Sequence, residues 1–410
     1  MNAIRLDCRG KASAEAGRAI VEGFNACTPG VHIDADVDEY STGLRMWLLE
    51  AGARHRALRL NDGGWQLDIT RGAAPAQGSV PGVHHVVAGG DSIWTCRRGA
   101  LVARIDAHTR QVVASRSVAR KASHLELHVQ SGLLFVADSA ADQVLALRAS
   151  DLQIEQRWPA PGGPQLPIAS PDGIVCVTGP GTGTLTIATP VGGGYRARTL
   201  AVGECPHDPL LSADGTEVFV PCAGSGEIVK VRLADTRITG RYRVGDGPSH
   251  LVLHPDGTRI YSANSWDGSV TCVTVEGALV ARATSGGWAH AIAITPDGRS
   301  VYVANFFDDS LAVFDAATLE RIALLETDAY PHGLDIAPDG SHALASCFAS
   351  DHVRVIDTRA HCQLARIAVG SGPSHAAFAN GCAYIGCSVA DHVACVDLAS
   401  LVLKGQTSVH

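Results

Sequence analysis

A histidine returns at nearly constant intervals through most of this 410-residue chain, each time at the head of the same predicted β-strand. Successive members are 39 to 43 residues apart, and a glutamine fills one place in the series. A period of about forty residues built from short strands is typical of a β-propeller, whose first strands line the central axis. The repeat therefore predicts a ring of imidazoles around a channel. Its members are His85, His124, Gln165, His207, His250, His290, His332 and His375.

Each repeating unit contains four predicted strands, and the pattern is clearest over residues 247–286. A short apolar strand ends at Pro-Asp-Gly, a second ends at Ala-Asn, and a turn with Asp or Gly leads to a third and then a fourth strand. Counting strand heads gives eight units, and the first and last both look complete. We predict a mainly β fold, an eight-bladed propeller over residues 81–410, with seven blades as the alternative.

Two segments resemble a known repeat motif closely. Tyr-Ser-Ala-Asn occupies residues 261–264, and Tyr-Val-Ala-Asn occupies residues 302–305. Residues 81–410 are therefore similar to the YVTN family of β-propellers. This resemblance implies the fold and not one activity, because the same fold serves binding modules, lyases and redox enzymes.

Residues 1–72 do not follow the repeat. Strands are expected at AIRLDC, GVHIDAD, RALRL and WQLDIT, and helices at SAEAGRAIVEGFNAC and STGLRMWLLEAGA. This order predicts a small α/β sandwich, βαβαββ, joined to the repeats by a linker over residues 73–80. Leu6, Asp7, Arg9 and Gly10 match the opening motif of the TusA/SirA sulfur carriers. The resemblance to that family covers the whole module.

The chemistry of that family depends on a Cys-Pro at a helix N-terminus, where the helix dipole favours the thiolate that carries a persulfide. In this chain Ser13 stands at the cysteine position, and Ala14 and Ala16 replace both prolines. A serine hydroxyl cannot carry persulfide sulfur. We therefore interpret the module as a docking or dimerising domain for a protein partner, with sulfur transfer as the alternative.

Antiparallel pairing places the end of each second strand beside the head of the first, so other side chains should share the channel mouth. In three of these places a cysteine replaces the asparagine of the repeat, and close packing of a small residue is the alternative to a ligand role. The predicted ligand-binding residues are Gln165, Arg97, Arg98, Cys222, Trp266, Phe306, Cys347 and Cys387. In some units the histidine directly follows the small residue that precedes the strand, as in Pro-His332, and in others it comes one place later, as in Pro-Ser-His250. Because successive side chains of a strand point to opposite faces, this one-residue difference in lead-in could divide the ring into two groups.

Charge and segment patterns exclude several classes of partner. The net charge is -8 with a pI near 6.1, and no basic run offers a surface for nucleic acid or an anionic membrane. No signal peptide pattern or long apolar segment occurs, so we expect a cytoplasmic protein. Most of the twelve cysteines fall within strand patterns, which favours reduced, buried thiols. We find no Ser-His-Asp order, phosphate-binding loop or dinucleotide motif.

Several neutral imidazoles near one axis are most readily satisfied by a metal ion or a polar ligand. Eight blades with histidines at their strand heads resemble the d1-haem domain of bacterial nitrite reductase. That resemblance implies axial and distal roles for such histidines. It also implies that Arg97, Arg98 and Lys121 pair with tetrapyrrole carboxylates, and that Trp266 and Phe306 flank the macrocycle.

Two other hypotheses stay open. The ring could hold copper or iron without haem, in an enzyme acting on a small sulfur compound, because imidazole suits both metals. Alternatively, the propeller is a non-catalytic scaffold for protein–protein interaction. The sequence favours a metal- or haem-dependent oxidoreductase with a small-molecule ligand in its channel. It does not assign the catalytic residues.

Overall fold

The computed structural model describes residues 3–9, 19–20, 32–37, 53–59, 65–71, 83–97 and 99–409. Its first four strands form one sheet in the order β1-β2-β4-β3, with β1 parallel to β2 and β4 antiparallel to both of its neighbours. They fall where the sequence predicted strands. The linker and most residues of the two predicted helices lie outside the described residues. The strands are β1 (Ala3–Asp7), β2 (His32–Val37), β3 (Ala53–Arg59) and β4 (Trp65–Arg71).

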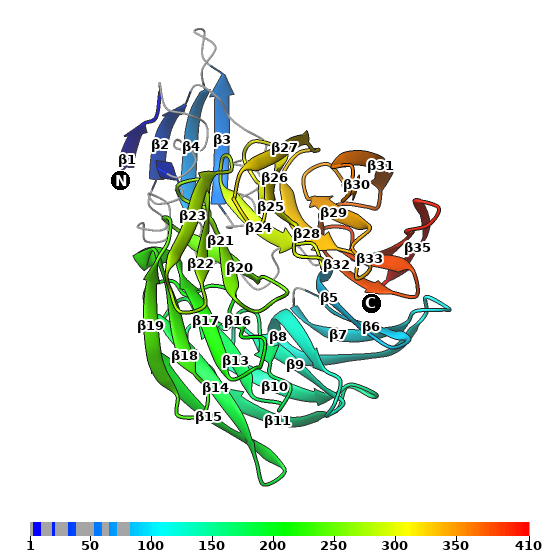
Figure 1. The fold of residues 1–410 in the computed structure, drawn as a ribbon. Helices are drawn as coiled ribbons and strands as arrows, with labels where there is room; N and C mark the ends of the chain where they lie inside the picture. Colours follow the sequence, from blue (N-terminus) through cyan, green and yellow to red (C-terminus); the bar gives the residue numbers. More distant parts are fainter. Residues whose placement is uncertain are drawn as a thin grey trace.

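Eight blades follow, arranged around a centre (Figure 1). Six are separate four-stranded sheets, and one seven-stranded sheet makes up blades 1 and 2. The two are joined because β8 is 17 residues long and pairs first with β7 and then with β9. Blades 1 and 2 contain β5 (Val83–Gly89), β6 (Ser92–Arg97), β7 (Gly99–Asp106), β8 (Val112–His128), β9 (Leu133–Asp138), β10 (Gln143–Arg148) and β11 (Ile154–Pro159).

The other six blades each use four consecutive strands, so within the described residues no strand is exchanged between the chain ends. Blades 3 to 5 contain β12 (Ile168–Ala169), β13 (Val175–Gly179), β14 (Thr184–Val191), β15 (Gly194–Ala201), β16 (Leu210–Leu211), β17 (Glu217–Cys222), a 3-10 turn η1 (Ala223–Ser225), β18 (Glu227–Arg232), β19 (Arg237–Arg243), β20 (Pro248–Leu253), β21 (Arg259–Asn264), β22 (Ser269–Thr274) and β23 (Leu279–Thr284). Blades 6 to 8 contain β24 (Ala289–Ile294), β25 (Ser300–Asn305), β26 (Ser310–Asp315), β27 (Arg321–Glu326), β28 (Pro331–Ile336), β29 (His342–Cys347), β30 (His352–Asp357), β31 (Cys362–Ala368), β32 (Pro373–Ala379), β33 (Cys382–Cys387), β34 (His392–Asp397) and β35 (Val402–Ser408).

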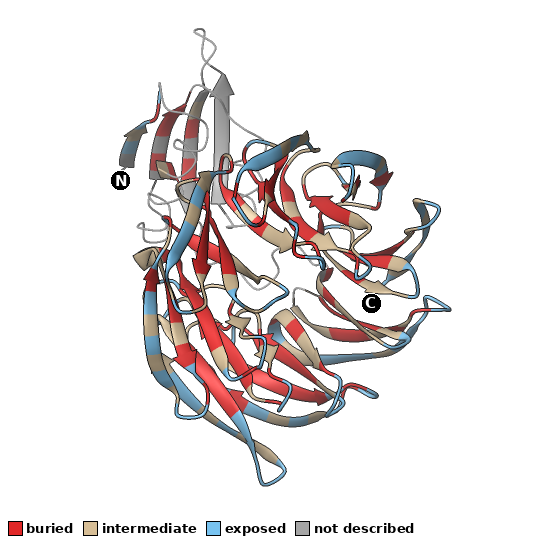
Figure 2. Cartoon of the chain, in the orientation of Figure 1, coloured by how far each residue is buried: buried red, intermediate tan, exposed pale blue. Residues whose placement is uncertain are grey.

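Burial follows the position of a strand within its blade. The second and third strands are buried along most of their length, as in β25, where all six residues are buried. Such continuous apolar runs occur because neighbouring blades cover both faces of the sheet. The outer strands alternate between exposed and half-buried residues, as in β35, and Figure 2 shows this change from centre to rim. The first strands are largely half-buried, which suits a channel lining.

Buried side chains join neighbouring blades and close the ring between blades 8 and 1. The Tyr384 hydroxyl donates to the Ala107 carbonyl at 2.6 Å, and the Ser388 hydroxyl donates to the Val83 carbonyl at 3.0 Å. The seam is therefore held by side-chain hydrogen bonds and apolar packing. Equivalent bonds join other blades: Trp94 to Ala149, Tyr261 to Ala316 and Tyr302 to Thr358.

Replacing Tyr384 with phenylalanine is expected to lower the free energy of unfolding by about 1–3 kcal/mol, because the buried Ala107 carbonyl loses its partner. Urea denaturation followed by circular dichroism measures this change. Tyr261→Phe is the matched control, since it removes a bond of the same length between two blades that are continuous in the chain. A loss below about 0.5 kcal/mol in Tyr384→Phe would show that this bond does not hold the seam.

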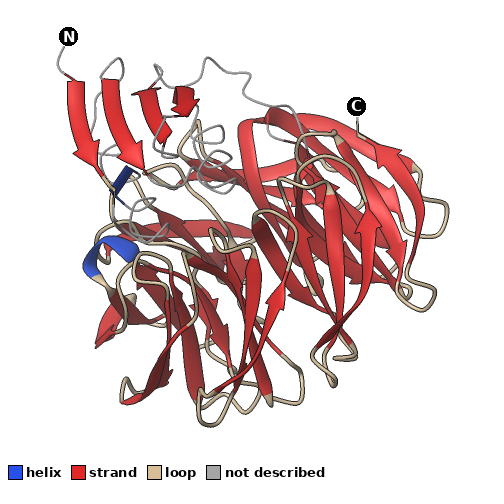
Figure 3. Ribbon diagram, turned by 90° about the horizontal axis from the view of Figure 1, so that it is seen from above, coloured by secondary structure: helices blue, strands red, loops and turns tan. Residues whose placement is uncertain are grey.

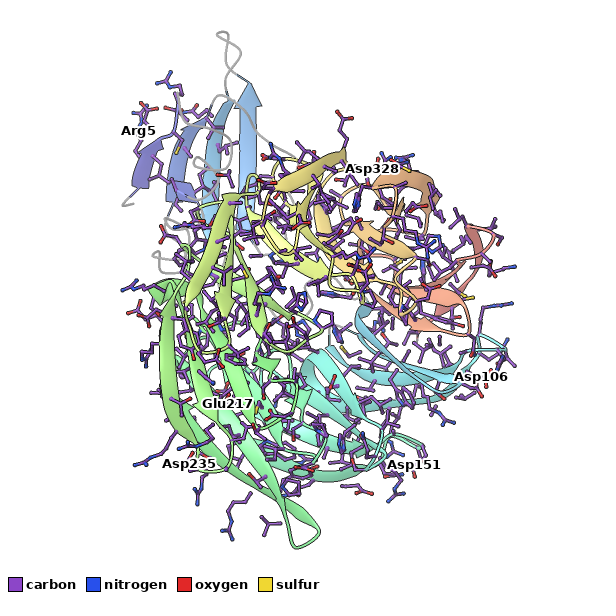
Figure 4. The ribbon with its side chains drawn as sticks, viewed as in Figure 1. Arg5, Asp106, Asp151, Glu217, Asp235 and Asp328 are labelled. Atoms are coloured by element: carbon purple, nitrogen blue, oxygen red, sulfur yellow. The ribbon has the colours of Figure 1, made fainter. Side chains whose placement is uncertain are left out.

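Acidic side chains stabilise the outer turns and lie away from the channel. Asp106 accepts a hydrogen bond from the Thr109 amide at 2.7 Å, and Asp235 pairs with Arg232 at 2.8 Å. Figure 4 shows Asp106, Asp151 and Asp235 at the outer ends of their blades. These carboxylates therefore serve the local turns.

Candidate functional site

The structure brings all seven repeat histidines together as an arc of neighbouring imidazoles. Centroids of adjacent rings lie 4.5 to 5.7 Å apart. The two ends of this histidine arc flank blade 3, where Gln165 stands in the series and donates its backbone N–H to the Thr178 carbonyl at 3.2 Å. Residues separated by up to 290 positions therefore meet at one mouth. The order along the arc is His124, His85, His375, His332, His290, His250 and His207.

A β-bulge at the head of the first strands explains why the variable lead-in does not divide the arc. In blade 5 the extra residue is Ser249, directly before His250, whereas in blade 7 the extra residue is His332 itself. A bulge places two residues opposite one and re-aims their side chains. His332 and His375 come from the two different lead-in patterns, yet their rings lie 5.4 Å apart. The two predicted groups thus form one arc.

Asp208 joins the arc at its blade 4 end. Its Oδ2 atom lies 3.2 Å from His250 Nε2, and its Oδ1 atom lies 3.8 Å from His207 Nδ1. The Asp208 side chain is 18% exposed. Burial acts to raise the pKa of Asp208, but the two imidazoles outweigh it and hold that pKa well below its usual range. A carboxylate with negative charge therefore lies between two ring nitrogens.

Two imidazoles farther along the arc, His85 and His290, are held in the neutral form. Burial, followed by repulsion from neighbouring imidazoles, lowers the pKa of His85 and of His290 well below the usual value. The Nδ1 atom of His85 is buried and has no hydrogen-bond partner among the described residues. Neutral imidazole presents a lone pair, which is the form that coordinates metals. His85 and His290 therefore offer nitrogen donors at neutral pH.

Two carboxyl groups lie on first strands below the arc, and burial raises the pKa of each to about 7. These are Glu126 of β8 and Asp335 of β28. Asp335 Oδ2 accepts a hydrogen bond from the Ala376 amide of the next blade at 2.9 Å. Each carboxyl thus faces backbone of a neighbouring first strand and is half protonated near neutral pH.

Aromatic side chains cover one side of the arc. The Phe306 ring lies 5.1 Å from His290, and the rings of Tyr330 and Phe348 lie 6.3 and 6.0 Å from His332. Trp266 packs against the same cluster. These aromatics form an apolar wall beside two of the imidazoles.

The amino-terminal sheet packs on this aromatic wall. One hydrophobic cluster joins the wall to buried residues of the sheet, and Figure 3 shows the strands nearest the N-terminus standing over one edge of the propeller. The module therefore lies at the mouth of the channel, on the side of blades 5 to 7. Its members in the cluster are Cys8, Ile20, Ile33, Ala35, Val37, Leu67 and Ile69.

The three predicted cysteines lie inside the blades. Each thiol is fully buried and donates to a backbone carbonyl, as Cys387 does to Val369 at 3.4 Å. Burial raises the pKa of Cys222, Cys347 and Cys387 to about 12, so none is a thiolate at neutral pH. These properties favour the close-packing alternative over a ligand role.

Of the two arginines that the sequence predicted at the channel mouth, the structure describes only Arg97. Arg97 forms an ion pair with Asp391 of blade 8 at 2.5 Å, so its guanidinium already has a carboxylate partner. Arg98 lies outside the described residues. Neither observation adds support for pairing with the carboxylates of a tetrapyrrole.

Sequence reasoning did not single out Asp208, Trp288 or Tyr330. A signal for the two aromatics was present, because each stands two positions before a ring histidine, in Trp-Ala-His290 and Tyr-Pro-His332. Both residues have positive φ angles, 57° and 65°, which turn the chain immediately before the strand. Aromatics at this position therefore line the mouth.

Fold and site together define an eight-bladed β-propeller with a histidine-lined mouth. Residues 197–366, less than half of the chain, match the family model described as Lactonase, 7-bladed beta-propeller. The described residues nevertheless form eight blades. No curated protein sequence matches the chain. Among the described residues, no helix has the length and apolar character needed to cross a membrane.

Solved structures share the fold at low sequence identity. Kuenenia stuttgartiensis hydrazine synthase is 19% identical, with a TM-score of 0.57 over 69% of this chain and 97% of that one. The dihydro-haem d1 dehydrogenase NirN, in complex with DHE, is 17% identical, with a TM-score of 0.60 over 71% and 68%. A 6-phosphogluconolactonase-like protein from Bacteroides fragilis is 17% identical, with a TM-score of 0.55 over 72% and 96%. These likenesses show the propeller fold alone.

Proposed function

We propose that the histidine arc binds a redox-active metal ion or a haem, and that the protein is a metal- or haem-dependent redox protein. The observation that carries this proposal is the contact of seven imidazoles at one mouth. A cluster of buried nitrogen donors, including a His85 Nδ1 without a hydrogen bond in the described structure, costs free energy unless a ligand satisfies it. Imidazole binds copper and iron, so the donor set fits either ion and a haem iron.

The surrounding residues support such a centre in three ways. Neutral His85 and His290 have lone pairs available for coordination, and Asp208 supplies negative charge against a cation. The aromatic wall with Phe306 and Tyr330 excludes water from one side. A bound metal or haem would supply the electron transfer. The small substrate would then enter from the channel.

A d1-type haem is one form of this proposal. The fold is shared with NirN, which was solved in complex with DHE, and an apolar wall suits a macrocycle. Copper or iron without haem is the other form. The amino-terminal sheet at the mouth is the natural surface for a protein partner, since it lies beside the site without contributing one of its nitrogen donors.

The deciding experiment is elemental analysis with a visible spectrum on protein purified without a histidine tag. The proposal predicts close to one equivalent of iron or copper per chain. A Soret band would identify haem, and metal without that band would identify the non-haem form. Less than about a tenth of an equivalent after incubation with haem, iron and copper in turn would overturn the proposal and favour the scaffold alternative.

A further inference from the structure

One end of the histidine arc differs chemically from the rest. In the part of the chain that the structure describes, only His207, Asp208 and His250 form a group whose three ligand atoms all lie within 4.8 Å of one another. Each carboxylate oxygen faces one imidazole, with separations of 3.2 Å to His250 and 3.8 Å to His207. A cation placed among the three groups could therefore be coordinated by the carboxylate and by both ring nitrogens.

The local backbone explains why three donors meet here. The bridge between Pro206 and Cys222 and the pair between Leu210 and Phe219 differ by one residue in register. This bulge allows consecutive residues His207 and Asp208 to approach the same place, whereas a regular strand would point them to opposite faces. His250 reaches the group from the head of the next blade.

We infer that His207, Asp208 and His250 bind one ferrous ion, and that this subsite is where the metal of the proposed redox centre sits. The inference rests on the proposed function and narrows it to a non-haem site. Two imidazoles and one carboxylate are the donor set of non-haem Fe(II) sites that keep coordination positions open. The open positions would admit a small ligand from the channel.

The position of the subsite supports an open coordination sphere. It lies at the end of the arc beside blade 3, which contributes Gln165 in place of a histidine. The first strands there are short, with two residues each in β12 and β16. His290 is the nearest further imidazole, with its centroid 4.5 Å from that of His250. One side of the ion would therefore face protein nitrogen and the other the channel.

The test is anaerobic titration of the full-length protein with Fe(II), followed by desalting and iron analysis. Asp208→Asn keeps the size of the side chain but removes its charge, and it should weaken iron binding at least tenfold, as should His207→Gln. His108→Gln, which replaces a histidine bonded to Asp91 outside the arc, is the matched control and should change the affinity less than twofold. His375→Gln, on the far part of the arc, distinguishes this subsite from the arc as a whole. Circular dichroism and the melting temperature show which variants are folded. If Asp208→Asn does not fold, His207→Gln decides the question.

The outcomes separate this inference from the proposed function. If His375→Gln loses as much iron as Asp208→Asn, or if Asp208→Asn binds iron normally, the subsite is wrong while the arc can still hold a metal or haem. In the second case Asp208 is only an ion-pair partner of His250. If the wild type binds neither iron, copper nor haem, the proposed function fails as well.

Discussion

Replacing His250 and His332 together with alanine is expected to lower the bound metal or haem roughly tenfold or more, with the β-type circular-dichroism spectrum unchanged. Both residues flank His290, whose ring lies 4.5 Å from His250 and 5.3 Å from His332. The double replacement therefore interrupts the arc on both sides of its middle. Both side chains are half-buried and face the channel, so shortening them leaves space open to solvent and no sealed cavity.

Histidines outside the arc provide a matched control for this experiment. His108 bonds to Asp91 at 2.9 Å, and His342 bonds to Ser341 at 2.7 Å, both away from the mouth. Replacing His108 and His342 with alanine removes two imidazoles and should leave the metal or haem content unchanged. Equal stoichiometry in the two double variants would show that the arc does not bind the group.

Replacing Asp335 with asparagine is expected to raise the free energy of unfolding at pH 8, by at most about 4 kcal/mol. Burial raises the pKa of this carboxyl from 3.8 to about 7, so the folded protein at pH 8 holds a carboxylate in an unfavourable place. An asparagine oxygen can still accept the hydrogen bond from the Ala376 amide. The substitution therefore removes the charge and keeps the contact. Urea denaturation at several pH values measures the change.

The upward direction of the Asp335 pKa shift determines how the effect of Asp335→Asn depends on pH. A group whose pKa is higher in the folded state favours folding below its unfolded pKa, and that contribution is lost as pH rises through the folded value. The advantage of Asp335→Asn should thus be small at pH 4 and grow between pH 4 and about 7. Asp339→Asn is the control, because bonds from Ser341 lower the pKa of Asp339. A pH-independent difference for Asp335→Asn would contradict the argument.

The fold followed from the sequence because each unit repeats the same local rules. Turn residues, alternating strands and a period near forty specify a blade, and identical blades can pack in only a few ways. Counting the repeats was therefore enough to predict the eight first strands. The amino-terminal strands were also predicted where they occur, while the likeness of that module to sulfur carriers stays a prediction.

The details of the site were harder to predict because they depend on tertiary geometry. Asp208 follows His207 directly, and alternation in a regular strand would have pointed it away from the arc. The bulge that reverses this expectation has no local sequence signature. The role of the cysteines was likewise ambiguous, since only the burial of Cys222 and its equivalents distinguishes a packed thiol from a ligand. The contact between the amino-terminal module and the channel mouth joins segments that are far apart in the sequence, and no sequence pattern indicates it.

The seam between blades 8 and 1 has an evolutionary consequence. Tyr384 and Ser388 close the circle through side chains, and in the part of the chain that the structure describes neither end adds a strand to a sheet begun at the other. A duplication or deletion of one whole repeat among blades 3 to 8 would consequently leave every remaining sheet intact, and only the curvature between neighbours would need to adjust. Propellers that close in this manner can change their number of blades in a single genetic event.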